Sequence, residues 1–549
     1  MIPQRSSLVW MFGTALLGLA SIPGTTAAQF VEPPPPAAYA LQNVTVVQAD
    51  GSRVAGVNVV VRGGMIEAMG ANVPIPADAQ VLEGDSLMVY PGLIDAQGKA
   101  EYEFPEVDRS GVASWAPPRS VQSFMPHLRV VDHLTATGDD LDDRRKQGVI
   151  AAAVHADGRL MPGRGAVLLY RKDAETPQEL VLAPELGPVM SFRGAQGVYP
   201  TQVFTVMAFI RQSFEDASRD GLIIREYARD PRGIPTPKWD PDYAVLRNVL
   251  AGDQPVYFVA NSAEDIRNVL TLSGEYEFRP VIVGGGEAWK VAERLREDAI
   301  PVLVSLDFPN PSRWDPDEEP MEPAALREKQ ELENLYSNAG RLAEAGVTIA
   351  LTSGGGEADI REGVRKAIEY GLSEEAALEA ITTTPAALLG FPQLVRVAEG
   401  MPANFLVTDG ELFSEEANIA YTLVEGMLEE GRVGRAAGAG GASVVNMAGT
   451  WEVVLDGEMT ATMTLTQEEG GDLSGVFSLG EMGSGDISGT ISGNDLALTI
   501  SITVGGQSMA VEIEGTVEGD SASGDGSSDM GDFSWTAKRT GGPGEEARK

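Results

Sequence analysis

The sequence contains no cysteine and only three histidines among its 549 residues. The absence of cysteine excludes disulfide bonds, thiolate catalysis and every metal site that needs sulfur ligands. The three histidines, His127, His133 and His155, leave little imidazole for a conventional zinc site. Basic residues are also few, because 41 Lys and Arg stand against 80 Asp and Glu, a net charge of −39. So acidic a chain lacks the clustered cations that bind nucleic acid or anionic lipid headgroups.

The N-terminus has the features of an export signal. Arg5 supplies a positive charge, residues 8–20 form a short apolar run, and residues 26–28 offer small side chains for cleavage before Gln29. An uncleaved membrane anchor is the alternative. We expect a signal peptide over residues 1–28 and a periplasmic or secreted protein. No membrane insertion is expected after cleavage, since no other run approaches ~18 apolar residues.

The middle of the chain alternates between short apolar strands and amphipathic helices. This alternation over residues 93–390 predicts a parallel α/β fold, most simply a (β/α)8 TIM-like barrel. A doubly wound sheet is the alternative, and the absence of a GxGxxG motif after an early strand favours the barrel. The expected strands are 149–154, 256–260, 281–283, 301–305 and 347–351, and the expected helices are 263–272, 287–298, 322–345 and 360–370.

The C-terminal part changes character after a small-residue linker at 434–447. Residues 448–539 contain short alternating strands with Gly, Asp and Asn at the turns, which predicts a small antiparallel β-barrel or sandwich domain. Residues 540–549 are expected to form a tail. One interpretation is that this part binds a glycan or lipid through exposed aromatic side chains such as Trp451 and Trp535. Small residues alternate with them, which favours packing in the core instead.

Three stretches resemble signatures of the amidohydrolase superfamily. Residues 90–96 (YPGLIDA) resemble the element that begins the first barrel strand, and residues 371–390 (GLSEEAALEAITTTPAALLG) resemble a signature near the barrel's end. Residues 400–407 (GMPANFLV) are similar to the return of the chain to a β-sandwich. The resemblance covers about residues 38–430 and lies closest to the imidazolonepropionase-like branch.

The resemblance implies a composite β-sandwich built from residues 29–92 and 391–433, flanking a barrel at 93–390. It also implies an active site at the carboxyl ends of the barrel strands. The reaction it implies is hydrolysis of carbon–nitrogen bonds other than peptide bonds, assisted by zinc or another divalent metal.

The sequence departs from this resemblance at the metal-ligand positions. The two histidines of the family's HxH motif would stand at Gln97 and Lys99, and a later histidine near Asn261. The next ligand strand aligns with residues 283–286, and the catalytic aspartate would fall near residues 353–354. A catalytic zinc ion takes three protein ligands, usually with imidazole among them. We therefore expect no metal site and no cofactor.

The remaining polar residues of this region form the candidate site. Lys99, Glu357 and Asp359 are the candidates for acid or base catalysis without a metal. His155 follows a buried strand where a barrel residue faces the active site, with a hydrogen-bonded rim histidine as the alternative. Arg164, in a PGRGA turn, is a candidate for binding a substrate carboxylate. The expected ligand-pocket residues are Gln97, His155, Arg164, Asn261, Gly285, Ser353 and Gly354.

Two glycine triplets, at 284–286 and 354–356, follow expected strands. They fit either close approach of a ligand to the backbone or simply the positive φ angles of tight turns.

Two interpretations of function follow. The chain is an exported amidohydrolase-family hydrolase of carbon–nitrogen bonds whose usual metal site is missing. Alternatively, it is a catalytically inactive pseudoenzyme that binds a small ligand or scaffolds an active paralogue. The hydrolase would bind a small-molecule substrate, and the ligand-binding pseudoenzyme would bind a small-molecule ligand. A homo-oligomer or a paralogue is the expected protein partner, and no nucleic acid.

Overall fold

The computed structural model describes residues 38–541, with gaps in the main body at 83–85, 114, 116, 312–321, 357–358, 416 and 432–445. Further gaps fall in the C-terminal part at 456–458, 468–471, 479–483, 493–494, 505–506, 520 and 529–532. The expected signal segment and Glu357 lie outside the described residues, as does most of the expected linker.

One sheet joins the two ends of the main body. Its strand order is β17-β16-β15-β5-β1-β2-β3, and β4 pairs with β1. Strands β5 and β15, more than 300 residues apart in sequence, are antiparallel neighbours, with Val89 opposite Val407. The segments that the resemblance assigns to a composite sandwich therefore share one sheet. The strands are β1 Ala38–Val47, β2 Arg53–Arg62, β3 Met65–Gly70, β4 Ala79–Val81, β5 Met88–Pro91, β15 Phe405–Thr408, β16 Ile419–Val424 and β17 Met427–Glu430.

The α/β part contains two further sheets. A five-stranded parallel sheet has the order β10-β11-β12-β13-β14, and a four-stranded sheet has the order β6-β7-β8-β9. The strands are β6 Leu93–Gly98, β7 Val149–Val154, β8 Ala166–Leu169, β9 Val181–Ala183, β10 Val189–Ser191, β11 Val256–Ala260, β12 Pro280–Gly284, β13 Val302–Ser305 and β14 Ile349–Thr352.

These sheets differ from a regular eightfold barrel. Strand β8 is antiparallel to β7, and no helix of the described residues lies between them. The connection from β7 to β8 is shorter than the crossover of a dozen or more residues that a parallel pair needs. The structure is a mixed α/β fold, and the predicted eight parallel β/α units are not confirmed.

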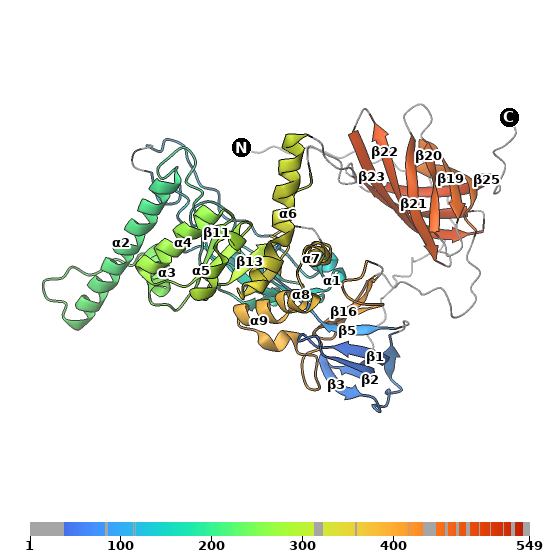
Figure 1. The fold of residues 1–549 in the computed structure, drawn as a ribbon, viewed down its shortest axis with the longest axis horizontal. Helices are drawn as coiled ribbons and strands as arrows, with labels where there is room; N and C mark the ends of the chain where they lie inside the picture. Colours follow the sequence, from blue (N-terminus) through green and yellow to red (C-terminus); the bar gives the residue numbers. More distant parts are fainter. Residues whose placement is uncertain are drawn as a thin grey trace, which may run out of the picture.

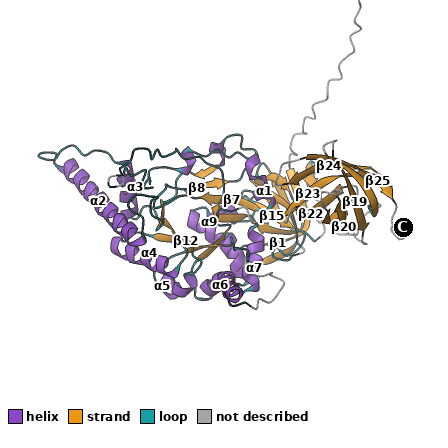
Figure 2. Cartoon of the chain, turned by 90° about the horizontal axis from the view of Figure 1, so that it is seen from above, coloured by secondary structure: helices purple, strands orange, loops and turns teal. Residues whose placement is uncertain are grey.

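Helices flank the strands of the α/β part, and Figure 2 shows α4 to α7 along one side of them. Serine side chains begin two of these helices: Ser262 accepts a hydrogen bond from the N–H of Asp265, and Ser373 from that of Ala376. The helices are α1 Asp142–Lys146, α2 Val203–Arg229, α3 Pro241–Leu250, α4 Ala263–Tyr276, α5 Ala292–Glu297, α6 Pro323–Glu344, α7 Ile360–Glu369, α8 Glu374–Ile381 and α9 Thr383–Leu389.

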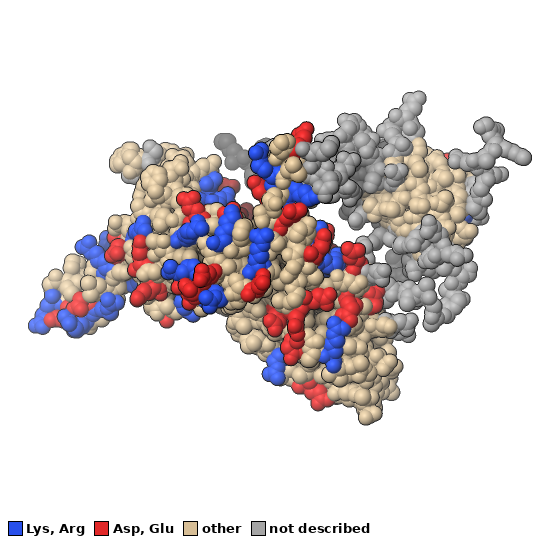
Figure 3. All heavy atoms as spheres, in the orientation of Figure 1, with Lys and Arg blue, Asp and Glu red and all other residues tan. Residues whose placement is uncertain are grey.

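Helix α2 projects from the body (Figure 1) and was not expected from the sequence. Its buried residues end at Gly221, while Leu222 is 50% exposed. Among the described residues, no helix is both long and apolar enough to cross a membrane. On the face shown in Figure 3, side chains of both charge signs are interleaved, which leaves no broad cationic patch there.

The C-terminal strands form a closed barrel in the order β18 to β25. The side chains of Trp451 and Trp535 lie in its core, at 0% and 2% exposure, so both pack inside, as the alternation pattern favoured. The predicted antiparallel strands are therefore present, and their standing as a separate domain stays a prediction. The strands are β18 Gly449–Leu455, β19 Met459–Gln467, β20 Asp472–Ser478, β21 Ser484–Ser492, β22 Asp495–Val504, β23 Gln507–Glu518, β24 Ser521–Ser528 and β25 Phe533–Gly541.

Candidate functional site

A cavity of about 690 Å³, here called the mouth pocket, lies at the carboxyl ends of the α/β strands. Val154 and Ser191 are the last residues of β7 and β10, and both line it. A neighbouring cavity of about 540 Å³, the side pocket, shares part of this wall. The two cavities have Gln97, Val259, Val283 and Gly354 in common.

A buried carboxylate joins the strands beneath these pockets. The Ser353 hydroxyl donates to Asp95 Oδ2 at 2.5 Å, and the Ser353 and Gln97 backbone N–H groups donate to Oδ1 at 3.3 and 3.0 Å. Burial raises the pKa of Asp95, while the hydrogen bonds from Ser353 and Gln97 act in the opposite direction. Neither Asp95 nor Ser353 lines a described cavity, so this pair fixes the junction of β6 and β14.

Gln97 lines the mouth pocket and carries a side-chain hydrogen-bond acceptor. Its Nε2 donates to the Gly354 carbonyl at 3.3 Å, and its own backbone carbonyl accepts from Gly355 at 2.7 Å. Both contacts hold the residue against the turn after β14. Within the described residues, its Oε1 is buried and has no hydrogen-bond partner.

His155 presents a second acceptor. Its Nε2 lies 2.9 Å from the Ala96 carbonyl oxygen, which can only accept, so Nε2 carries the proton and Nδ1 is the acceptor. Nδ1 is buried without a partner among the residues that the structure describes. Burial lowers the pKa of His155 to about 4, against the weaker opposing effect of its bond to Ala96, so the ring is neutral at pH 7. The ring also packs on Tyr257, with centroids 4.6 Å apart.

Ser191, which the sequence analysis did not identify, adds a third polar group. The side chain is 3% exposed, and its Oγ has no partner in the described part of the chain. The available signal was a polar residue ending the apolar strand β10.

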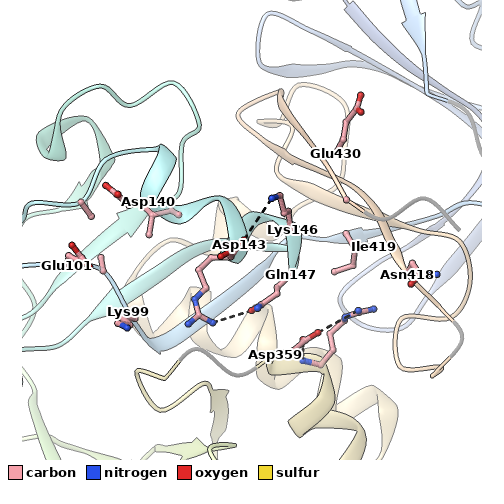
Figure 4. A pocket seen from close by; sticks show the side chains of 16 residues that line it. Lys99, Glu101, Asp140, Asp143, Lys146, Gln147, Asp359, Asn418, Ile419 and Glu430 are labelled. Carbon is pink, nitrogen blue, oxygen red and sulfur yellow. Dashed lines mark hydrogen bonds and ion pairs between the residues drawn. The ribbon is translucent and has the colours of Figure 1, made fainter. Parts of the chain in front are cut away.

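The structure places the other predicted residues as follows. Lys99 lines the mouth pocket and also a third cavity, of about 860 Å³ (Figure 4). Asp359 is the N-cap of α7, where its Oδ1 accepts from the N–H of Arg361 at 2.8 Å. Arg164 pairs with Glu185 and donates to the His127 carbonyl at 3.2 Å, and it lines neither the mouth pocket nor the side pocket.

Two more predicted residues lie near the side pocket. Asn261 lines it, together with Ser305 and Asp307. Gly285 does not, and its φ of +60° and its N–H bond to the Ala260 carbonyl at 3.1 Å identify a tight turn. Of the two explanations for the glycine triplet at 284–286, the structure therefore shows the tight turn at Gly285.

No family model matches the sequence, and no curated protein does. Solved structures do match: an amidohydrolase from Thermotoga maritima superposes with a TM-score of 0.58 at 21% identity, over 72% of this chain and 100% of that one. The chain has the amidohydrolase fold. The resemblance seen in the sequence motifs is confirmed at this level, and the imidazolonepropionase-like branch stays a prediction.

Two further structures with this fold have lower scores. A prolidase complexed with N-methylphosphonate-L-proline matches at a TM-score of 0.44 and 16% identity, over 72% of this chain and 100% of that one. An adenosine deaminase from Xanthomonas campestris with bound zinc matches at 0.39 and 14%, over 74% and 96%. Neither carries the functional argument.

The residues present do not fit the metal that the amidohydrolase fold implies. Within the described ranges, no three His, Cys, Asp or Glu side chains form a group that could hold a metal ion. Other side chains also fill the space at Gly284 and Gly354, which belong to the stretches that the resemblance aligns with ligand positions. A Cβ on Gly284 would lie 2.1 Å from Asn261 Oδ1, and one on Gly354 would lie 2.4 Å from Ser305 Oγ. Those distances are far shorter than any ordinary contact of a side chain.

Proposed function

We propose that this chain is an exported binding protein with the amidohydrolase fold, which holds a small hydrogen-bond donor in the mouth pocket without a metal ion. One observation carries the proposal: Gln97, His155 and Ser191 all line the mouth pocket, and each has a buried side-chain polar atom (Oε1, Nδ1 and Oγ) without a hydrogen-bond partner among the described residues. A buried polar atom without a hydrogen bond costs about 1–3 kcal/mol, which a matching ligand would recover.

The chemistry of these groups restricts the ligand. Gln97 Oε1 and the neutral His155 Nδ1 can only accept, so the ligand must present N–H or O–H donors to them. The Ser191 hydroxyl can take either role. A cavity of about 690 Å³ lies within the usual size range of small-molecule sites. Primary amides and ureas are compounds with this donor pattern.

Hydrolysis of a carbon–nitrogen bond is the second candidate function, and the fold supports it. Lys99 and His155 line the same pocket, as do the carboxylates of Glu101, Glu103 and Asp157, and a reaction without a metal would use groups of this kind. A general base works best with a pKa near the operating pH. The lowered pKa of His155, about 4, makes it a weak base at pH 7, which favours binding over catalysis.

The deciding experiment measures thermal shifts of the metal-free protein, kept in EDTA, against amides, ureas and their N-methylated analogues. We expect a donor-bearing compound to raise the melting temperature and its N-methylated analogue to fail. Ser191→Ala should weaken binding about tenfold, the effect of one hydrogen bond. Ser213→Ala is the matched control, since Ser213 is also buried but bonds to the Phe209 carbonyl within α2.

Two results would contradict the proposal. Hydrolysis products detected by mass spectrometry in EDTA would replace binding with metal-free catalysis. Near-stoichiometric zinc in protein purified without chelators would contradict the absence of a metal site. Export is tested separately by N-terminal sequencing of the mature protein, which should begin at Gln29.

A further inference from the structure

Helix α2 carries two exposed apolar side chains on one face. Phe204 is 74% exposed near its start and Leu222 is 50% exposed near its end. The two are 18 residues apart in the sequence, which is five turns of an α-helix, so they lie on the same side and about 27 Å from each other. The buried residues of the helix, such as Val206 and Ala217, lie on a different side. In Figures 1 and 2, α2 forms an outer edge of the α/β part.

Four residues between these two complete a seam along the same face. The six positions are separated by 4, 3, 4, 3 and 4 residues, which is the spacing of a helix face that packs against another helix. Ala208, Glu215 and Ser218 are exposed, and Arg211 is half-buried. We call this set the α2 seam: Phe204, Ala208, Arg211, Glu215, Ser218 and Leu222.

The side chains of the α2 seam are arranged symmetrically about its midpoint. A large apolar residue stands at each end, a small residue stands next to it, and an arginine and a glutamate stand in the middle. If two copies of this helix lie antiparallel about a twofold axis, Phe204 faces Leu222 of the second copy, and small residues face each other next to them. Arg211 then faces Glu215 of the second copy, once on each side of the axis. Twofold contact requires such a self-complementary surface.

The contacts that the two central residues already make are compatible with this pairing. Arg211 binds Glu275 of α4 through Nε at 2.6 Å and Nη2 at 2.8 Å. A guanidinium has five N–H donors, and Nη1 takes no part in that contact. Glu215 Oε1 accepts a long hydrogen bond, 3.4 Å, from the Tyr276 hydroxyl. A glutamate of a second copy can therefore approach the open side of Arg211.

The charges along α2 also balance, in a chain whose net charge is −39. The whole helix has four acids and four arginines and no lysine. Copies of so acidic a chain repel one another in general, and a helix without net charge lowers that repulsion where it meets its own copy. The charged residues of α2 outside the seam are Asp216, Arg219, Asp220, Arg225, Glu226 and Arg229.

We propose that the α2 seam docks against the α2 seam of a second copy of this chain, as an antiparallel pair about a twofold axis. The apolar ends are removed from water, and the opposite charges in the middle fix the register. A seam of about 27 Å is short compared with interfaces of ~1,200 Å² or more, so the dimer is a weak one, with a dissociation constant of about 1–100 µM. The inference does not depend on the ligand proposed for the mouth pocket.

The first test is analytical ultracentrifugation of the full chain from about 0.5 to about 500 µM, a range that brackets the expected constant. We expect the average mass to rise from that of one chain toward that of two. Phe204→Ser should weaken self-association tenfold or more, because it removes the largest apolar side chain of the seam. Val54→Ser is the matched control, since Val54 is a 56% exposed apolar residue of β2, and it should leave the constant unchanged.

The second test uses charge reversal to determine the register. Arg211→Glu and Glu215→Arg each place like charges on both sides of the axis, so each variant alone should self-associate tenfold or more weakly than the wild type. In an equimolar mixture of the two variants, unlike chains face each other with an arginine opposite a glutamate at both places. The dimer should therefore return in the mixture. A contact that does not bring position 211 against position 215 would not show this recovery.

Three results would overturn the proposal. A chain that stays monomeric at about 500 µM would leave the seam for a different protein. Wild-type self-association in Phe204→Ser would place the dimer on another surface, and a mixture without recovery would contradict the antiparallel register. Circular dichroism checks that each variant folds. If Arg211→Glu does not fold without its contact to Glu275, the exposed positions still decide through Phe204→Ser and Glu215→Arg.

Discussion

Acidification from pH 7.5 to pH 4 should destabilise the protein, because the His155 ring is buried in its neutral form. The pKa of this ring is lowered from its ordinary value of 6.5 to about 4, mainly by burial. Between these two values the unfolded chain binds more protons at His155 than the folded chain does. The free energy of unfolding therefore falls as the pH falls through this window.

The magnitude follows from the size of the shift. A change of one pKa unit corresponds to about 1.4 kcal/mol, so a shift from 6.5 to about 4 amounts to at most about 3 kcal/mol at pH 4. Asp95 acts in the opposite sense, since its raised pKa makes the folded chain take up a proton earlier. The wild-type chain must therefore be compared with His155→Gln at each pH, because the contribution of Asp95 is then common to both.

We expect the difference in free energy of unfolding between wild type and His155→Gln to shrink by about 3 kcal/mol between pH 7.5 and pH 4. Urea denaturation at each pH measures it. Imidazole NMR provides a direct readout, since the chain has only three histidines and the variant identifies the signals of His155. A His155 pKa of 6 or higher, or a difference that does not change with pH, would refute the reasoning.

Three substitutions test the packing around the site by chemical denaturation. Arg145→Leu should cost up to roughly 3–5 kcal/mol, because the buried Glu429 loses its 2.9 Å partner and keeps only Lys172 Nζ at 3.4 Å, and adding Glu429→Leu should recover part of that loss. Gly284→Ala should cost about 1–3 kcal/mol, since its Cβ would contact Asn261 Oδ1 and its φ is +93°; adding Asn261→Gly should recover only the steric part. Ser373→Ala should cost about 1 kcal/mol through loss of the α8 N-cap, with amide exchange increasing at that end.

Local patterns in the sequence predicted the individual strands well. The expected strands at 149–154 and 256–260 match β7 and β11, because each is a short apolar run bounded by polar residues. The direction of a strand was not predictable in the same way. The buried run of β8 has no feature that distinguishes parallel from antiparallel pairing, and the helix-free connection before it determines the outcome.

Helix α2 was missed for a related reason. Its buried residues stop at Gly221, so the last eight residues carry exposed apolar side chains such as Leu222 and Ile223 instead of a regular buried stripe. The apolar stripe therefore does not predict a helix over the full length of α2.

The candidate site was predictable only residue by residue. Gln97 and His155 stand where the family motifs and strand ends put them, and both line the mouth pocket. The free acceptor on His155 depends on its contact with the Ala96 carbonyl, which is a tertiary feature. Arg144 and Arg361 line one cavity although they lie far apart in the sequence, and no local pattern indicates this.

The packing of Asn261 against Gly284 also restricts how the chain can change. A side chain at position 284, within the stretch 283–286 that the resemblance aligns with a ligand strand, would place its Cβ 2.1 Å from the Asn261 amide oxygen, so any larger residue there is overpacked. The order of substitutions then matters: Asn261 must become smaller before position 284 can become larger, and that earlier step brings no ligand of its own. A larger side chain at position 284 is in this sense opposed by a neighbour that already occupies the space.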